Sequence, residues 1–455
     1  TQSTWGRSHF FVSIIETRME VETYKIFPAS PKPPLSLPVT IYDVFWLSFP
    51  PTSRIFCYES ATLSSKNFYD GVLDSLKRSL SLTLDHFPIL AGHVVWPSDS
   101  PRPFFLYTPN DAVSLTVVQC SETYLFSTLT AQDATEATLA RGCIAELHSS
   151  EAQAQVMTLK LTFFPNQGFV IGITCHHGVV DGLSMSMFMK AWSFLCNDAG
   201  ASLPLSLVPH LERPEEDGNP EEGLYEKALE RSTSRSPKSV KLPPSPALNP
   251  TLIRRKFVFT QKNADDLRRT VTAYFPDEEI MHLSPLVLVF SLAIVCLAKA
   301  KNTETDIIAN TPGNYRGRIG LENYFGNCLI GASRELKAEA VKGYNGVAMV
   351  AKNVAEMMTE LKKMSHTEAL KKNFLTGKLN GPAIFIGIAG SPRFGLHKVN
   401  FGWGVPVKIF CTSIDGTNSI AVEAGEDDGD IQFDVVMEPD FMEEFRRLFA
   451  NNLEK

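Results

Sequence analysis

The chain has 455 residues, of which 44% are hydrophobic and 20% are charged. One hydrophobic core stops growing near about 250 to 300 residues, so this length predicts two domains of roughly 200 residues each. Lys and Arg number 43 against 50 Asp and Glu, which gives a net charge of -7. Because the two signs are dispersed along the chain, we predict no basic face and exclude nucleic acid as an expected partner.

The first residues match no targeting signal. The apolar stretch 10–15 is too short for the hydrophobic region of a signal peptide, and the sequence opens with Thr1. We therefore expect residues 1–18 to be an upstream extension outside the fold, with Met19 as the initiator. Nothing else in the sequence directs the protein elsewhere, so we expect a cytoplasmic location.

Helical and strand-like patterns alternate over residues 19–205, which we expect to form the N-terminal domain. Apolar residues from Phe68 to Leu80 follow helical spacing, and Pro88 ends that helix. The segment 90–96, with the sequence LAGHVVW, predicts a strand after a glycine turn.

A predicted β-hairpin ends on two histidines. Residues 156–164 alternate with period two, and the turn residues PNQG separate them from a second strand, FVIGITCHH. After Gly182, apolar residues between Met185 and Leu195 follow the spacing of an amphipathic helix. The segment 176–181 is therefore predicted to be a strand-to-helix turn.

Residues 206–250 differ sharply in composition from the segments on either side. Prolines, the acidic run PEEDGNPEEG and a Ser/Arg/Lys-rich stretch leave few apolar residues, which predicts a linker or exposed crossover. We expect a second domain over 251–455, with turns at 312–317, 390–395 and 425–429.

The longest apolar run extends from Pro285 to Ala298. It is shorter than the ~20 residues that cross a bilayer, so we predict a buried helix or strand and no membrane partner. The eight cysteines are scattered singly, without a CxxC pair or the His spacing of a zinc site. We therefore expect reduced thiols and no metal site.

The segment HHGVVDG, residues 176–182, carries the residue types needed for acid–base chemistry. A base that deprotonates a hydroxyl near neutral pH needs a pKa near the working pH, and His177 meets that need. Asp181, across a turn closed by Gly182, either orients the imidazole or pairs with a remote arginine, and spacing alone leaves both open. His176 is expected to be structural, and metal ligation is disfavoured because HHxxxD lacks the helical His pair of zincins.

These residues and two later segments resemble a known family. HHGVVDG is similar to the HxxxD motif of CoA-dependent acyltransferases, and NFGWG near the C-terminus resembles the DFGWG motif of the plant BAHD acyltransferases. YFGNC is identical to the signature of the BAHD clade that acylates anthocyanins and other phenolic glycosides. The last two segments comprise Tyr324, Phe325, Gly326, Asn327 and Cys328, and Asn400, Phe401, Gly402, Trp403 and Gly404. Further blocks of the resemblance are 87–94, 314–318 and 391–396, so it spans about residue 24 to the C-terminus.

The resemblance implies an α/β fold of two chloramphenicol-acetyltransferase-like domains, each a mixed sheet with helices, joined by a long crossover loop. It further implies a solvent channel for acyl-CoA and acceptor, no bound cofactor, and a monomer. In the family the Asp of the motif pairs with an arginine, and Arg316 is the candidate here.

For the remaining motif residues, a structural role is the first expectation. Two glycines let the backbone of NFGWG turn around large aromatic rings, although the Trp403 indole is also a candidate oxyanion donor. Asn327 is a second oxyanion or channel candidate. Tyr324 to Gly326 predict an aromatic turn in the core or beside the acyl channel, and Cys328 lacks the basic neighbours of a nucleophile.

Two departures from the family pattern bear on the donor. Asn400 replaces the usual Asp, which removes an ion pair and predicts reduced rigidity or a changed partner. Leu183 stands where malonyl-transferring relatives commonly carry Lys or Arg, which can meet a free carboxylate. Arg393 and Lys408 are candidate substitutes, and both a malonyl and a hydroxycinnamoyl donor stay open.

The function that follows from the resemblance is acyl transfer from CoA to a sugar hydroxyl of a flavonoid, anthocyanin or other phenolic glucoside, with His177 as general base. The alternatives are a peptide-synthetase condensation domain, another HHxxxDG acyltransferase with an alcohol or amine acceptor, and a catalytically silent relative that binds phenolic glycosides or CoA. YFGNC and NFGWG argue against the condensation domain. The identity of the glycoside and the acylated hydroxyl stay open.

Overall fold

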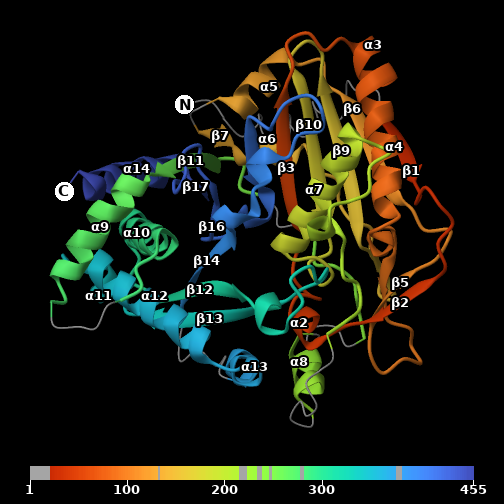
Figure 1. Cartoon of the computed structure of the whole chain (residues 1–455). Helices are drawn as coiled ribbons and strands as arrows, with labels where there is room; N and C mark the ends of the chain where they lie inside the picture. The colour runs from red at the N-terminus through yellow and green to blue at the C-terminus, as the bar shows by residue number, and fades with distance from the viewer. Residues whose placement is uncertain are drawn as a thin grey trace.

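The computed structural model describes residues 21–131, 134–214, 223–232, 238–244, 248–276, 281–375 and 382–454. The predicted extension 1–18 and the predicted start Met19 lie outside these residues. Strands and helices alternate through the described chain, which is the mixed α/β class predicted above. Figure 1 shows two sheet-and-helix halves, with the C-terminal helices packed on one of them.

Six strands of the described chain form the sheet of the N-terminal half. Helices α4 (Asp74–Leu84) and α7 (Gly182–Asn197) pack against each other beside it (Figure 1). The strand order is β1 (Val21–Ile26), β6 (Val113–Gln119), β9 (Met157–Phe164), β10 (Gly168–Cys175), β3 (Thr52–Glu59) and β15 (Lys408–Cys411).

Seven described strands form the sheet of the C-terminal half. The strand order is β13 (Leu329–Leu336), β12 (Ile307–Asn314), β14 (Ile384–Gly390), β16 (Ile420–Ala424), β17 (Ile431–Met437), β11 (Ile253–Phe259) and β7 (Thr135–Glu136). The helices of this half are α9 (Gln261–Ala273), α10 (Pro285–Ala300), α11 (Ala338–Lys342), α12 (Gly346–Lys363), α13 (His366–Leu375) and α14 (Pro439–Leu453).

A smaller sheet and several short helices complete the N-terminal half. The sheet has the order β2 (Leu35–Pro38), β5 (Phe104–Tyr107), β4 (His93–Val95) and β8 (Gln153–Gln155). The helices are α2 (Ile41–Val44), α3 (Ser65–Asn67), α5 (Thr123–Thr130) and α6 (Ala137–Arg141), with α8 (Leu224–Ser232) in the crossover.

The predicted hairpin and turn form as the sequence pattern indicates. β9 and β10 pair antiparallel, with Phe164 opposite Gly168 across the short turn. β10 is buried along its whole length and ends at Cys175, directly before the two histidines. On α7 the predicted apolar residues Met185 and Leu195 are buried, but so is every residue from Ser184 to Met189, so the helix is covered on more than one side.

The long apolar run becomes helix α10. Ser284 caps its N-terminus by accepting a hydrogen bond from the N–H of Val287, and Pro285 occupies the first turn. The helix packs against α12 and α14 and is buried on nearly every side, which explains its uniformly apolar sequence. No helix in the described part of the chain combines the length and apolar character that spanning a bilayer requires.

The predicted turn at 312–317 begins later than expected. β12 continues through Pro312 and Gly313 to Asn314 and pairs with β13 over its full length. A side chain on Gly313 would come within 2.7 Å of Leu361 on α12, so glycine here allows close helix packing. The chain turns only at the 3₁₀ helix Arg316–Arg318.

The crossover 206–250 is less exposed than its composition predicts. Part of its acidic run lies outside the described residues, but α8 buries Tyr225 and Leu229 and packs on α2. Val240 and Leu242 are buried as well. Several of the sparse apolar residues of this segment are thus buried, whereas Val208 is exposed.

Two strands cross between the halves. β15, from the C-terminal half of the chain, pairs with β3 in the N-terminal sheet, and β7, from the N-terminal half, pairs with β11. The limits 19–205 and 251–455 stay a prediction for the two domains. The exchanged strands tie the two halves of the chain together.

Candidate active site

The turn between β10 and α7 is held by Asp181. This residue has an extended backbone and caps α7, since its Oδ1 accepts a hydrogen bond from the N–H of Ser184 at 2.9 Å. A side chain on Gly182 would lie 2.8 Å from the ring of Phe394, so only glycine lets segment 391–396 pack this closely. The turn therefore fixes where His177 leaves the sheet.

Asp181 and Arg316 form a fully buried ion pair. Arg316 donates from Nη1 to Asp181 Oδ2 at 2.8 Å and from Nη2 to Oδ1 at 3.0 Å, the bidentate geometry that guanidinium and carboxylate favour. Both side chains are 0% exposed. The structure thus brings together the two residues that the family resemblance pairs.

Arg316 also organises the YFGNC segment. Its Nε donates to the backbone carbonyl of Tyr324 at 2.8 Å, and Nη2 donates to that of Gly326 at 2.7 Å. The N–H of Cys328 donates to Asp181 Oδ2 at 3.2 Å. Ser184, on α7, both donates to and accepts from the Gly326 backbone, at 2.9 and 3.0 Å. One buried arginine therefore joins the His-bearing turn to a segment about 140 residues later in the sequence.

His177 is half-buried at the centre of this arrangement. Its Nδ1 is buried and makes no hydrogen bond to another described residue, which leaves Nε2 as the accessible ring nitrogen. Burial lowers the pKa of the imidazole, and its own backbone carbonyl and the Asp181 charge partly oppose that shift. A neutral imidazole at working pH is the form that can accept a proton.

His176 points into the core. It is fully buried, and its Nδ1 accepts a hydrogen bond from the N–H of Gly178 at 3.1 Å. Burial, together with the neighbouring His177, lowers the pKa of His176 to about 3, so this ring is neutral. Its placement fits the structural role expected for it.

Asn327 holds the backbone of the base. Its Nδ2 donates to the carbonyl of His177 at 2.9 Å and to Asp43 Oδ1 at 3.1 Å. Both amide hydrogens are therefore occupied, and Asn327 is not placed to donate to an oxyanion. Asp43 lies on α2 and is fully buried, and that burial raises its pKa.

Cys328 packs in the core, as expected. It is fully buried, and burial raises the pKa of its thiol to about 12, so a nucleophilic thiolate is disfavoured. All eight cysteines are free thiols. Among the described residues no three His, Cys, Asp or Glu side chains gather as a metal ion would require.

Two residues of this region had no signal in the sequence. Trp46, which follows α2, stacks on the imidazole of His177 with ring centroids 4.1 Å apart. Arg213, in the crossover, donates to the hydroxyl of Tyr324 at 2.6 Å and to the carbonyl of Phe325 at 3.2 Å. A side chain on Gly326 would lie 2.3 Å from Arg213 Nη1, which explains the glycine of YFGNC. Neither residue belongs to a spaced motif, so only tertiary contacts identify them.

The NFGWG segment lies at the other end of β10. Trp403 packs edge-on against Phe169 at 6.0 Å, and Phe401 packs against Trp192 at 4.9 Å. Phe169 is near the start of β10 and Cys175 ends the strand about 20 Å further along, and His177 follows two residues later. The structure does not place Trp403 beside the base.

The backbone of NFGWG requires its glycines. Gly402 and Gly404 have φ values of 105° and 93°, in the region that favours glycine. Asn400 Oδ1 accepts a hydrogen bond from the N–H of Gly402 at 2.7 Å, and the Asn400 carbonyl accepts one from Asn197 on α7 at 2.6 Å. The segment therefore packs against α7 as a structural element.

The donor-site candidates separate in space. Leu183 is half-buried in the first turn of α7, and exposed Arg393 directly precedes Phe394, which covers Gly182. Lys408 instead lies in β15, where its Nζ donates to the carbonyl of Ala131. Of the two predicted substitutes for a cation at 183, only Arg393 is adjacent in sequence to a residue that touches this turn.

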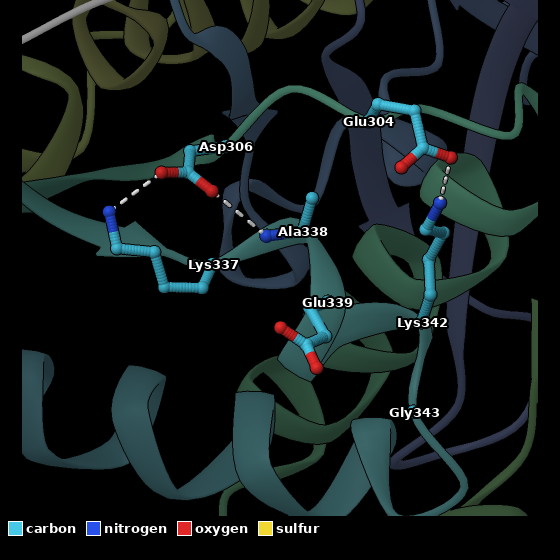
Figure 2. Close-up of a pocket in the computed structure, with 7 residues that line it drawn as sticks. All are labelled: Glu304, Asp306, Lys337, Ala338, Glu339, Lys342 and Gly343. Atoms are coloured by element: carbon cyan, nitrogen blue, oxygen red, sulfur yellow. Dashed lines mark hydrogen bonds and ion pairs between the residues drawn. The ribbon is translucent and has the colours of Figure 1, made fainter.

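A separate hollow of about 500 Å³ lies on the C-terminal half, between β12 and α11. Figure 2 shows two ion pairs in its lining, Lys337 with Asp306 and Lys342 with Glu304, and the carboxylate of Glu339 apart from them. It contains no residue of the His-bearing turn or of the three motifs. The candidate site is therefore the turn around His177.

Comparisons with known proteins agree on the family. A model of the Transferase family matches residues 18–451. The chain is 31% identical to the malonyl-CoA:anthocyanidin 5-O-glucoside-6''-O-malonyltransferase of Arabidopsis thaliana, over 95% of this chain and 98% of that protein. It is also 31% identical to phenolic glucoside malonyltransferase 1 of A. thaliana, over 86% of this chain and 88% of that protein.

Solved structures share the fold. Vinorine synthase matches with a TM-score of 0.65 at 18% identity, over 94% of this chain and 96% of that chain. A Fusarium sporotrichioides protein determined with coenzyme A and T-2 matches with a TM-score of 0.59 at 14% identity, over 90% and 96%. The predicted two-domain fold class is confirmed. The chain belongs to the Transferase family, and it is a BAHD-type, acyl-CoA-dependent acyltransferase.

Proposed function

We propose that this enzyme transfers an acyl group, malonyl in the first instance, from CoA to a sugar hydroxyl of a phenolic or flavonoid glucoside, with His177 as general base. The observation that carries the proposal is the state of His177. Its turn is fixed on both sides by buried contacts, and Nε2 is its only ring nitrogen open to a substrate.

The reaction follows from that geometry. Nε2 of His177 removes the proton of the acceptor hydroxyl while the hydroxyl oxygen attacks the thioester carbonyl. The tetrahedral intermediate then collapses, the carbon–sulfur bond breaks, and the imidazolium returns its proton to the CoA thiolate. The ester and free CoA leave together, and His177 is neutral again. Transfer is direct, with no acyl-enzyme.

Asp181 supports the base without touching it in this scheme. Its two oxygens accept hydrogen bonds from Arg316, from the N–H of Ser184 and from the N–H of Cys328. A carboxylate engaged in this way is not free to orient the imidazole directly. Asp181 therefore acts through the shape of the turn and through its negative charge.

The acceptor and donor classes rest on the relatives. Two proteins at 31% identity are named for anthocyanidin glucoside and phenolic glucoside malonyl transfer. A relative at 27% identity, over 95% of this chain, is named agmatine coumaroyltransferase, so an aromatic donor and an amine acceptor form the second candidate function. Leu183 in place of a cation favours that second donor class, and exposed Arg393 favours the first.

The test is a mass-spectrometric assay of the purified protein with cyanidin 3-glucoside, supplied separately with malonyl-CoA and p-coumaroyl-CoA. His177→Ala is the control. We expect a malonylated glucoside that disappears in the variant. A coumaroylated product alone would replace malonyl by the aromatic donor, and release of CoA thiol with agmatine alone would replace the glucoside by an amine. No thiol release with any of these acceptors would contradict the proposal and favour a binding protein.

A further inference from the structure

Three aromatic side chains follow α2 and are here called the aromatic cover: Phe45, Trp46 and Phe49. Trp46 and Phe49 lie against the ring of His177, and in the described part of the chain Phe45 packs on these two without a ring contact to the imidazole. The indole of Trp46 and the imidazole are parallel within 5°, with centroids 4.1 Å apart. Phe49 meets the imidazole edge-on at 6.1 Å. Within the cover, Phe45 contacts Trp46 edge-on at 4.9 Å.

The imidazole lacks the support that a catalytic histidine usually receives from a carboxylate. Nδ1 of His177 makes no hydrogen bond to another described residue. Asp181 is committed to Arg316 and to two backbone N–H groups. Asn327 fixes the backbone carbonyl of His177 but does not touch its ring. The stacked indole is therefore the side chain that lies flat against the ring, in addition to the hydrogen bond between the imidazole and its own backbone carbonyl.

We propose that Trp46 is the positioning residue for the general base: its indole holds the imidazole plane and stabilises the imidazolium formed during acyl transfer. This inference rests on the proposed function. A cation over the face of an indole is attracted by the ring quadrupole, and tryptophan gives the strongest such contact. The neutral imidazole gains less from the same stack, so the contact favours the protonated state that forms as the hydroxyl attacks.

One buried residue, Asp43, links the backbone of Trp46 to the backbone of His177. The backbone N–H of Trp46 donates to the backbone carbonyl of Asp43 at 2.9 Å. The side chain of Asp43 accepts hydrogen bonds from Thr40 and from Asn327. Asn327 in turn donates to the backbone carbonyl of His177, so the backbones that carry the indole and the imidazole are joined through Asp43 and Asn327.

The charged and titratable groups around His177 set the sign of the expected pH effect. Asp181 favours the imidazolium, its buried partner Arg316 offsets that charge, and His176 is neutral. Asp43 lies behind Asn327. Because the indole favours the protonated ring, its removal lowers the pKa of His177 further. The neutral base then persists to lower pH, and the acid limb of the rate profile moves to lower pH.

The experiment compares Trp46→Leu, Trp46→Phe and Phe45→Leu in steady-state assays of thiol release over a range of pH. Phe45→Leu is the matched control, because Phe45 packs on Trp46 with no ring contact to the imidazole among the described residues. We expect Trp46→Leu to lower kcat on the order of 10-fold, with KM for both substrates little changed and the acid limb displaced to lower pH. Trp46→Phe should recover most of the loss, and Phe45→Leu should remain near the parent enzyme.

Two results would overturn the proposal. Either Trp46→Leu keeps the parent kcat and pH profile, or its loss lies entirely in the KM of the acceptor, which would make Trp46 a substrate contact. Circular dichroism and thermal unfolding of each variant distinguish a folding defect from a catalytic one. If Trp46→Leu does not fold, the comparison is made with Trp46→Phe, which keeps an aromatic ring. Unchanged activity of His177→Ala would instead contradict the proposed function itself, so the two failures are distinguishable.

Discussion

Two buried sets of charges join the halves of this enzyme, and they are built differently. The Asp181–Arg316 pair is compact: every Arg316 nitrogen donates a hydrogen bond, at 2.7 to 3.2 Å. The second set, here called the charge network, comprises Arg54, Arg254, Lys256, Asp415, Glu423 and Asp434. Four of its ion pairs are 3.4 to 3.6 Å long.

The two sets of charges are both buried, but they differ in how completely their polar atoms are hydrogen-bonded. Within the described chain, Nε and Nη1 of Arg254, Oδ2 of Asp415 and Oδ1 of Asp434 are buried without a hydrogen bond. Asp181 and Arg316 have no such atom in that part of the structure. Buried charges that are only partly satisfied stabilise a fold weakly, whereas a fully bonded pair fixes geometry. We therefore infer that the Asp181–Arg316 pair fixes the geometry of the site. The charge network makes a smaller, pH-dependent contribution to the free energy of unfolding.

Among the variants of the two charged sets, Arg316→Met is expected to have the largest effect on stability and activity. It leaves the buried Asp181 carboxylate unpaired, so we expect a loss of about 3–5 kcal/mol in the free energy of unfolding and no measurable acyl transfer. Urea unfolding followed by circular dichroism measures the loss. Arg318→Met is the matched control, since Arg318 sits in the same 3₁₀ helix but contacts Tyr315 and carbonyls at the end of α12 instead of Asp181. Equal stability of the two variants would contradict the account.

Removing one charge from the charge network should lower the free energy of unfolding by less than Arg316→Met does. In Asp434→Asn the two cations it serves, Lys256 at 3.5 Å and Arg254 at 3.6 Å, keep Glu423 and Asp415 respectively. We expect a loss of about 1–3 kcal/mol in the free energy of unfolding, and a kcat within about twofold of the parent. A fall in kcat as large as that of Arg316→Met would show that the network also sets the site geometry.

Asp415 gives the network a pH dependence. Burial raises its pKa from 3.8 to about 6, and Arg254 only partly opposes this. Because the folded pKa is the higher one, the stabilising contribution of this group is complete below about pH 4 and is lost as pH rises through about 6. We therefore expect the parent enzyme to lose stability relative to Asp415→Asn between these two values. Thermal unfolding of both proteins at several pH values measures the difference, and parallel curves would remove Asp415 from the account.

The smallest effect is expected outside both sets. In Asn400→Asp the new carboxylate can still accept the hydrogen bond from the N–H of Gly402, and the site is exposed. We expect the free energy of unfolding and kcat to stay within about 0.5 kcal/mol and twofold of the parent. A large gain in activity would mean that Asn400 impairs this chain, contrary to the structural placement of NFGWG.

Much of the site could be predicted because its signals are local. The hairpin, the turn and α7 follow from period two, from turn residues and from helical spacing in one stretch of about 40 residues. The Asp181–Arg316 pairing came from family resemblance, since spacing alone left the partner open. Two of the three short blocks, HHGVVDG and YFGNC, meet at one end of β10, whereas NFGWG lies at the other end.

The rest depends on contacts between distant segments. Nothing in the spacing of Trp46 marks it as the neighbour of His177, because the two are joined only by folding. Arg213 lies in a segment whose composition predicts an exposed crossover. Trp403 and Lys408 carry suitable chemistry but lie elsewhere, since aromatic packing and the exchange of β15 fix their positions. Residue type alone cannot reveal such placements.

The most direct test of the central claim compares His177→Ala with His176→Gln in an assay of CoA thiol release from malonyl-CoA with cyanidin 3-glucoside. The account predicts that His177→Ala folds normally and loses on the order of 10² to 10⁴ in kcat, while His176→Gln, if folded, keeps a kcat near the parent. Folded His177→Ala with a parent-like kcat would contradict the assignment of His177 as the base.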